Sequence, residues 1–244
     1  MLIDKDKYKE SLVDLWSEVF GDDRSYIELI FNEEYKDSII CFAELEGDRA
    51  VSAFYLLENT LNFENKLYHG YYLYAAATLV SYRKKGLMSA LIKEAQSYCK
   101  ETRIDFISLV PSEESLYSYY ARYGFQKSMY RRSSNISTSD SVKIKPCDYY
   151  KARSLLRGSY INLTESTFSY AADCFIHVGA DFYKNNEGLF VYLPDEDEII
   201  EFLPDDLESE VQSEGTPFGM LYPINKNLFR NWKYTDIYMN IALD

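Results

Sequence analysis

The chain has 244 residues, of which 47% are hydrophobic, and its formal net charge is -13. The apolar content is ample for a packed core, while the acidity argues against nucleic acid as a partner, because phosphate backbones require a basic surface. No apolar run approaches the roughly 20 residues that span a bilayer. The first ten residues are too polar for a signal peptide, so we expect a cytoplasmic protein with no membrane contact.

Cysteine and histidine usage argues against a metal site. The only residues of these two types are Cys41, Cys99, Cys147, Cys174, His69 and His177. They are widely spaced, and no two cysteines form a Cys-x-x-Cys pair that is typical of zinc binding. The pattern predicts reduced thiols and no metal cofactor.

The N-terminal elements predict a mixed sheet with helices on it. Apolar residues at helical spacing in the first thirty or so residues indicate two helices, separated by a break at residues 21–23. Ser38–Leu45 and Ala50–Leu57 are typical of a hairpin. A turn at Asn62–Asn65 then leads into a long aromatic strand that ends near Val80.

The next junction has the features of an anion site. An apolar strand runs into Arg83-Lys84-Lys85-Gly86-Leu87-Met88, where an amphipathic helix begins. The first amides of a helix lack intrahelical partners and attract anions together with the helix dipole. Basic residues at this place run against the acidic composition of the chain. A solvated helix start is the alternative interpretation.

A second segment follows at a fixed distance. The run Asp105–Val110 predicts a buried strand, parallel to the preceding one because the helix between them has the length of a crossover. Ser112–Tyr123 predicts a helix that ends in Tyr120-Ala121-Arg122-Tyr123-Gly124-Phe125. Four tyrosines share this helix, and only the spacing to Gly124-Phe125 distinguishes Tyr120.

The two segments together resemble the GNAT family of N-acetyltransferases. The first is similar to the family's Arg/Gln-x-x-Gly-x-Gly/Ala motif through Arg83, Gly86 and Met88, and the second to its Tyr-x-x-x-Gly-Phe ending. A bulky Met88 in place of Gly or Ala is similar to two-domain relatives of the enhanced-intracellular-survival aminoglycoside acetyltransferase type. The resemblance implies a GNAT fold of the α/β (mixed α+β) class, with a mostly antiparallel sheet that splays between strands four and five.

The polar stretch 131–142 predicts a boundary between two units. We expect an acetyl-CoA-binding catalytic domain at 1–135 and a truncated GNAT-like half at 136–244 that shapes the acceptor pocket or an oligomer interface. In the second half, Pro146–Arg157 predicts a helix, and a less regular stretch reaches His177. Short strands are expected at Leu189–Leu193, Ile199–Leu203 and Phe218–Tyr222.

The resemblance also assigns roles to residues. It implies that acetyl-CoA is the cosubstrate, that a small primary amine is the acceptor, and that Tyr120 protonates the departing thiolate. The residues expected to bind the cofactor are Ala76, Ala77, Thr78, Arg83, Lys84, Lys85, Gly86, Leu87, Met88 and Ser89. Direct transfer needs no cysteine nucleophile. The terminal carboxylate of Asp244 is a candidate base, with Asp22, Asp23 and Glu28 as weaker alternatives.

Three questions stay open. Residues 195–214 carry ten carboxylates and no Lys or Arg, which predicts either a solvated acidic surface or a wall that attracts a cationic acceptor. A non-catalytic acyl-CoA-binding or regulatory module is the alternative to an enzyme. The family contains monomers and homo-oligomers, and the sequence identifies no interface.

Overall fold

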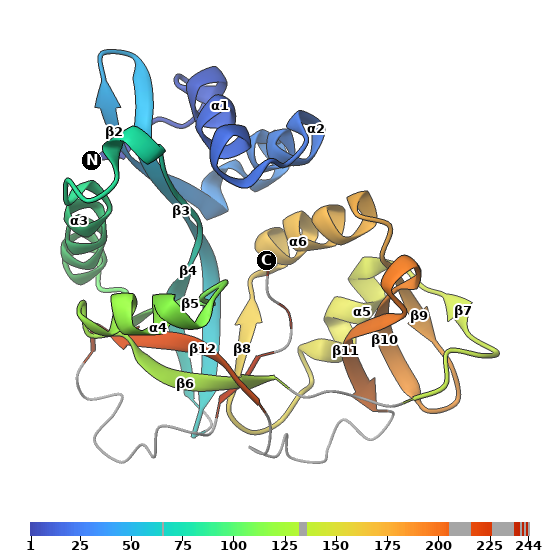
Figure 1. Ribbon diagram of the computed structural model, residues 1–244. Helices are drawn as coiled ribbons and strands as arrows, with labels where there is room; N and C mark the ends of the chain where they lie inside the picture. Colours follow the sequence, from blue (N-terminus) through green and yellow to red (C-terminus); the bar gives the residue numbers. More distant parts are fainter. Residues whose placement is uncertain are drawn as a thin grey trace.

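Two β-sheets and six α-helices make up the part of the chain that the computed structural model describes, which is residues 1–64, 66–131, 136–204, 216–225, 237–239, 241 and 243 (Figure 1). The large sheet has the strand order β1 (Leu2–Ile3), β2 (Ile39–Glu46), β3 (Arg49–Phe63), β4 (Lys66–Thr78), β5 (Phe106–Leu109), β12 (Thr216–Pro223), β6 (Gln126–Arg131), β13 (Ile237–Tyr238) and β8 (Tyr160–Leu163). The small sheet consists of β11 (Glu198–Pro204), β10 (Gly188–Leu193), β9 (Asp181–Lys184) and β7 (Val142–Lys143).

The α-helices occur in the order predicted from the sequence, and the structure contains one further α-helix that was not predicted. The α-helices are α1 (Lys9–Phe20), α2 (Arg24–Ile27), α3 (Leu87–Glu101), α4 (Glu114–Ala121), α5 (Pro146–Arg153) and α6 (Glu165–His177). Short 3-10 helices are η1 (Glu28–Phe31), η2 (Glu33–Ser38), η3 (Val80–Tyr82) and η4 (Pro194–Glu196). The expectation of a less regular stretch before His177 was wrong, because β8 and α6 occupy most of it. No helix in the described ranges has both the length and the apolar character needed to cross a membrane.

The large sheet is mixed, as predicted. Strands β2, β3 and β4 form antiparallel hairpins, and β4 runs parallel to β5. The β4–β5 pairing covers only Gly70 to Tyr72 against Phe106 to Ser108, and beyond it the two strands separate. The predicted splay between the fourth and fifth strands is therefore present, and it exposes one edge of β4.

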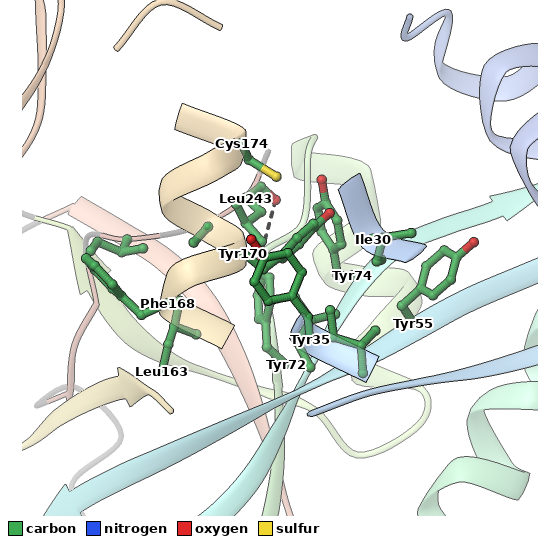
Figure 2. Packing of buried hydrophobic residues seen from close by; sticks show 14 of the residues in the cluster. Ile30, Tyr35, Tyr55, Tyr72, Tyr74, Leu163, Phe168, Tyr170, Cys174 and Leu243 are labelled. Atoms are coloured by element: carbon green, nitrogen blue, oxygen red, sulfur yellow. Dashed lines mark hydrogen bonds between the residues drawn. The ribbon is translucent and has the colours of Figure 1, made fainter. Parts of the chain in front are cut away.

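Side chains alternate between the two faces of the sheet and form two cores. On β3, Phe54 and Leu56 face α3 and α4, whereas Tyr55 and Leu57 face the side that α1, η1 and α6 cover. The core on the side of α1, η1 and α6 continues without interruption into α5 and the small sheet. Figure 2 shows its centre, where tyrosines of β4 meet α6 and Leu243.

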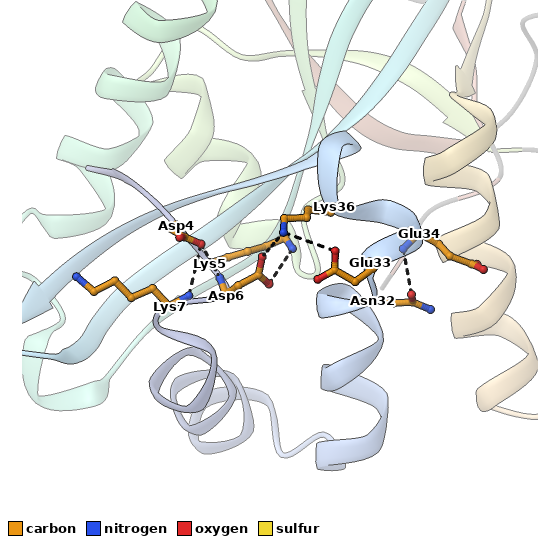
Figure 3. A network of polar contacts seen from close by, with 8 residues as sticks. All are labelled: Asp4, Lys5, Asp6, Lys7, Asn32, Glu33, Glu34 and Lys36. Atoms are coloured by element: carbon orange, nitrogen blue, oxygen red, sulfur yellow. Dashed lines mark hydrogen bonds and ion pairs between the residues drawn. The ribbon is translucent and has the colours of Figure 1, made fainter.

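Charged side chains tie the N-terminal segment to η2 on the outside of this core. Lys36 Nζ lies 3.8 Å from an Asp6 carboxylate oxygen and 3.5 Å from one of Glu33 (Figure 3). Lys5, which is almost fully buried, pairs with Asp6 at 3.4 Å and lies over the Phe31 ring. These contacts fix the position of η1 and η2, which in turn pack against α6.

Three strands of the second half belong to the large sheet. Strand β12 lies between β5 and β6, while β13 and β8 continue the sheet beyond β6. The other strands of this half form the separate small sheet, which α5 and α6 cover. The division into units at 1–135 and 136–244 stays a proposal, since these three strands share the sheet of the first segment.

A buried polar network joins the two sheets. Arg153 of α5 donates from Nε to Glu201 of β11 at 2.9 Å, and both side chains are fully buried. The same carboxylate accepts hydrogen bonds from Tyr149 at 3.1 Å and from Tyr238 of β13 at 2.9 Å. Arg153 also donates to the Ile161 carbonyl of β8 at 3.0 Å. Every partner compensates part of the cost of burying two charges.

Candidate active site

The predicted anion turn opens helix α3. Gly86 is the N-cap residue with φ +82°, and Lys84 is also left-handed with φ +62°. The first intrahelical bond of the turn runs from the Ala90 amide to the Gly86 carbonyl at 3.0 Å. The amides of Leu87, Met88 and Ser89 precede it and belong to the unbonded first turn, which makes them donors for an anion.

A cavity of 370 Å³, here called the turn cavity, lies against these amides. Its lining consists of Val19, Ala76, Thr78, Tyr82, Arg83, Lys84, Gly86, Leu87, Met88, Ser89, Leu116, Tyr119 and Tyr120. Arg83 is held in place because its Nε donates to the Thr78 carbonyl at 3.1 Å. Eight of the ten residues predicted to bind the cofactor therefore line one cavity.

Two of the predicted residues lie elsewhere. Lys85 is not part of the lining, and its Nζ lies 4.4 Å from the centre of the Tyr82 ring. Ala77 is buried in the sheet, where it pairs with Ala53. Met88 lines the cavity and also packs against the core beneath α3, so its bulk is shared between the two.

A second cavity, the central cavity, occupies the splay between β4 and β5. It has a volume of 120 Å³ and is lined by Trp16, Phe20, Asp22, Tyr72, Leu73, Tyr74, Ala75, Ala76, Leu109, Val110, Pro111, Ser112, Leu116, Tyr120 and Leu243. Ala76, Leu116 and Tyr120 line both cavities, so the two meet there. A long ligand in the turn cavity can thus reach the central cavity.

The edge of β4 is irregular at this meeting point. The register against β3 shifts between the pairs Ala53–Ala77 and Tyr55–Tyr74, which marks a β-bulge. Ala75 within it has φ +50°, a conformation that L-residues other than glycine seldom adopt. A bulge of this kind re-aims backbone groups that a regular strand would pair. Here Ala75 borders the central cavity, and Ala76 borders both cavities.

Tyr120 is the side chain that best fits a proton donor. It is 7% exposed and sits at the junction of the two cavities. Burial raises the pKa of its hydroxyl well above the ordinary value, with a smaller contribution from Tyr119. The hydroxyl is protonated at neutral pH, as that of an ordinary tyrosine is. The raised pKa makes it a weaker acid, so its place between the two cavities is what favours a role as proton donor.

Asp22 is the one charged residue among the described lining of the central cavity. Its Oδ2 accepts a hydrogen bond from the indole N–H of Trp16 at 2.7 Å, and the side chain is half-buried. The other carboxylates considered from the sequence are placed differently. Asp23 is exposed, Glu28 pairs with Arg24 at 2.8 Å, and Asp244 lies outside the described residues.

Sequence reasoning missed most of the central cavity. Trp16 and Phe20 come from α1, Tyr72 and Tyr74 from β4, and Leu243 from the last described part of the chain. Local patterns gave no signal for these residues, because long-range packing alone brings them together. The acidic stretch 195–214 is described only as far as residue 204, and of that part Glu198 borders a further cavity.

Comparison with known proteins agrees with this geometry. A model of the acetyltransferase (GNAT) domain matches residues 4–128, about half of the chain. A probable N-acyltransferase from Enterococcus faecalis has the same fold at 12% identity and TM-score 0.64, over 94% of this chain and 73% of its own. A GCN5-related N-acetyltransferase from Kribbella flavida gives 12% and 0.65, over 93% and 72%.

Eis1 from Mycobacterium abscessus is also similar in fold, with 10% identity and TM-score 0.62 over 84% of this chain and 59% of the other. No curated protein matches the sequence. The family model, the splayed sheet and the turn at α3 lead to one conclusion: the chain belongs to the GNAT family of acetyltransferases and is an acyltransferase.

Proposed function

We propose that the protein is an acetyl-CoA-dependent N-acetyltransferase that acts on the primary amine of a small cationic acceptor. One observation carries the proposal: the turn cavity and the central cavity meet at Ala76, Leu116 and Tyr120. A cofactor arm entering from one side and an amine entering from the other would come together beside the Tyr120 hydroxyl.

The turn cavity fits the phosphate-bearing cofactor. The first-turn amides of α3 and the Arg83 and Lys84 side chains supply hydrogen-bond donors and positive charge for a pyrophosphate. The space beside the left-handed Gly86 is open to a ligand, since nothing lies within 4 Å of a Cβ built on it. When bound, acetyl-CoA supplies an acetyl thioester, and the exposed edge of β4 offers Ala76 and Thr78 as its backbone contacts.

Tyr120 holds a proton at the point where the leaving sulfur would sit. The Tyr120 hydroxyl is protonated at neutral pH, and the adjoining β-bulge at Ala75 and Ala76 offers backbone polar groups to a developing oxyanion. An acceptor amine must lose a proton before it attacks. Asp22 is the described carboxylate within the central cavity, so it is the group that this structure offers to receive that proton or to orient the ammonium.

The acceptor class follows from the lining of the central cavity. Aromatic side chains of Trp16, Phe20 and Tyr74 form its walls, and Asp22 supplies its charge. A carboxylate among aromatic rings favours a cation, both by charge and by cation–π attraction. A small amine with an apolar body therefore fits better than a neutral or anionic acceptor.

Calorimetric titration of acetyl-CoA tests the cofactor site. Gly86→Glu should abolish binding, because it places a negative charge in the turn. Gly86→Ala carries the same left-handed strain, about 1–2 kcal/mol, without that charge, and should still bind. Equal loss in both variants would assign the effect to backbone strain, and absence of binding by the folded parent protein would refute the proposal.

Release of free thiol with a panel of amines tests the chemistry. Tyr120→Phe should lower kcat at least about tenfold while leaving cofactor binding near normal. Tyr119→Phe is the matched control, because Tyr119 lies on the same helix but lines only the turn cavity. Asp22→Asn should lower kcat/KM for charged amines, whereas Asp23→Asn should not.

A further inference from the structure

A third cavity, here called the outer cavity, lies next to the central cavity and has no part in the function proposed above. Its volume is 170 Å³. Its lining consists of Tyr26, Arg131, Cys174, Phe175, Val178, Leu193, Glu198, Ile200, Phe218 and Leu243. These residues come from both sheets and from α2 and α6, so the cavity exists only where the two halves of the chain pack together.

The size and chemistry of the outer cavity suit an apolar group. Apolar cavities of about 150 Å³ bind a benzene ring, and this one is slightly larger. Phe175, Ile200 and Phe218 contribute apolar walls. The thiol of Cys174 stays neutral, because burial raises its pKa to about 12. A ring or a branched alkyl group would thus be accommodated at little cost in lost hydrogen bonds.

The wall between the outer and the central cavity is thin. Leu243 lines both cavities, and the remainder of the wall contains a pair of tyrosines. Tyr74 lines the central cavity, Tyr26 lines the outer one, and their hydroxyl oxygens are 3.1 Å apart. Figure 2 shows Leu243 with Tyr72 and Tyr74 of β4 and with Tyr170 and Cys174 of α6 around it. The Leu243 carbonyl accepts a hydrogen bond from Tyr72 at 3.2 Å.

The charge at the outer cavity also favours a cationic ligand. Glu198 forms an ion pair with Arg131 at its border, and the exposed carboxylates of Asp195, Glu196 and Asp197 directly precede Glu198 in the chain. The local excess is negative, which raises the concentration of cations near the opening. The same preference governs the central cavity through Asp22.

We infer that the outer cavity is the second lobe of the acceptor site and binds an aromatic or branched alkyl group attached by a linker to the reacting amine. The inference rests on the proposed function and narrows its acceptor to an elongated, amphipathic amine. The amine lies near Asp22 in the central cavity, and the linker crosses the wall formed by Leu243, Tyr26 and Tyr74, where the contact between the two tyrosine hydroxyls must open to admit it. The second half of the chain thereby selects the substrate.

Direct binding measurements with two simple amines test this inference without requiring turnover. The probes are butylamine and 4-phenylbutylamine, which carry the same reacting end and differ by one ring. Calorimetric titration should show that the parent protein binds the phenyl compound about ten- to a hundredfold more tightly, the range expected for burying a ring.

Two tryptophan variants on α6 and its C-cap locate the ring. Val178 lines the outer cavity and is 51% exposed, while Ile176 is 48% exposed and is not part of the lining. Val178→Trp should fill the cavity and remove the preference for the phenyl compound, leaving butylamine binding unchanged. Ile176→Trp should keep the preference. Leu193→Trp, which enters the cavity from β10, replaces Val178→Trp if the latter does not fold.

Each outcome decides the matter. A phenyl preference that survives Val178→Trp, or that both tryptophan variants lose equally, would place the ring elsewhere and overturn the inference. Equal affinity of the parent protein for the two amines would also overturn it, while leaving the proposed function intact. If the parent binds neither amine, the cationic acceptor class fails, and the second lobe fails with it.

Discussion

Replacement of Arg153 by methionine is the most demanding test of how the two sheets are held together. Methionine matches the length of the arginine stem but removes the charge and the donors that reach Glu201 and the Ile161 carbonyl. Glu201 would be left fully buried without a cation. Loss of one partner of such a pair costs about 3–5 kcal/mol, a large share of the stability of a typical domain.

A control substitution at an exposed arginine separates the cost of leaving Glu201 buried without a cation from the general effect of removing a positive charge. Arg49 forms an ion pair with Glu18 at 3.5 Å, but their side chains are 59% and 56% exposed. Arg49→Met should therefore cost less than about 1 kcal/mol, as exposed pairs do. The contrast between the two arginines tests burial together with the hydrogen bonds made there, because the substitution is the same.

Urea unfolding measured on both variants gives the free energies. The double variant Arg153→Met, Glu201→Met should be more stable than Arg153→Met alone, because it removes the uncompensated carboxylate. The reasoning from buried charge is wrong if Arg153→Met lowers the free energy of unfolding no more than Arg49→Met does. It is also wrong if adding Glu201→Met to Arg153→Met lowers the free energy of unfolding again by as much as Arg153→Met did.

Three further predictions concern single side chains. Tyr55→Phe should leave stability unchanged or raise it, because the buried Tyr55 hydroxyl has no hydrogen-bond partner among the described residues; a loss above about 1 kcal/mol in thermal unfolding would contradict this. Gly70→Ala should destabilise by about 1–3 kcal/mol, since a Cβ at that position would lie 2.4 Å from the Phe106 ring, and an unchanged unfolding midpoint would refute it. Burial raises the pKa of the Cys174 thiol from 9.0 to about 12. As the pH rises above 9, this thiol therefore ionises in the unfolded chain but not in the folded one. The free energy of unfolding then falls by up to about 1.4 kcal/mol per pH unit because of this group. Cys174→Ala should make that decline shallower in urea titrations at pH 8 to 10, and an identical decline in the variant would exclude the thiol as its source.

The sequence was most informative where chemistry is local. The turn at Gly86 combines a positive φ, a helix start and basic neighbours within a few residues, so its place could be predicted. The strands of the second half at residues 188–193, 198–204 and 216–223 were also expected within one or two residues. Each depends on short-range alternation and on turn residues at its ends.

Helix α6 shows where a usable signal was overlooked. Phe168, Ala171, Ala172 and Phe175 recur at helical spacing, and the Thr164 side chain caps the helix by accepting from the Thr167 amide. Residues with strand preference within the segment obscured this period. The central cavity is different, because Trp16, Tyr74 and Leu243 meet only through the packed sheet, and no window of local sequence contains that information.

The position of β12 also constrains how the protein is made. Its residues pair with β5 on one side and with β6 on the other, although 106 residues of chain separate it from β5 and 84 separate it from β6. During synthesis the edges of β5 and β6 that pair with β12 stay unpaired until residue 223 has left the ribosome, and long-range strand pairings of this kind form slowly. A nascent chain that already carries the complete turn at Gly86 is therefore still an open-edged sheet, a species prone to aggregate and to need a chaperone.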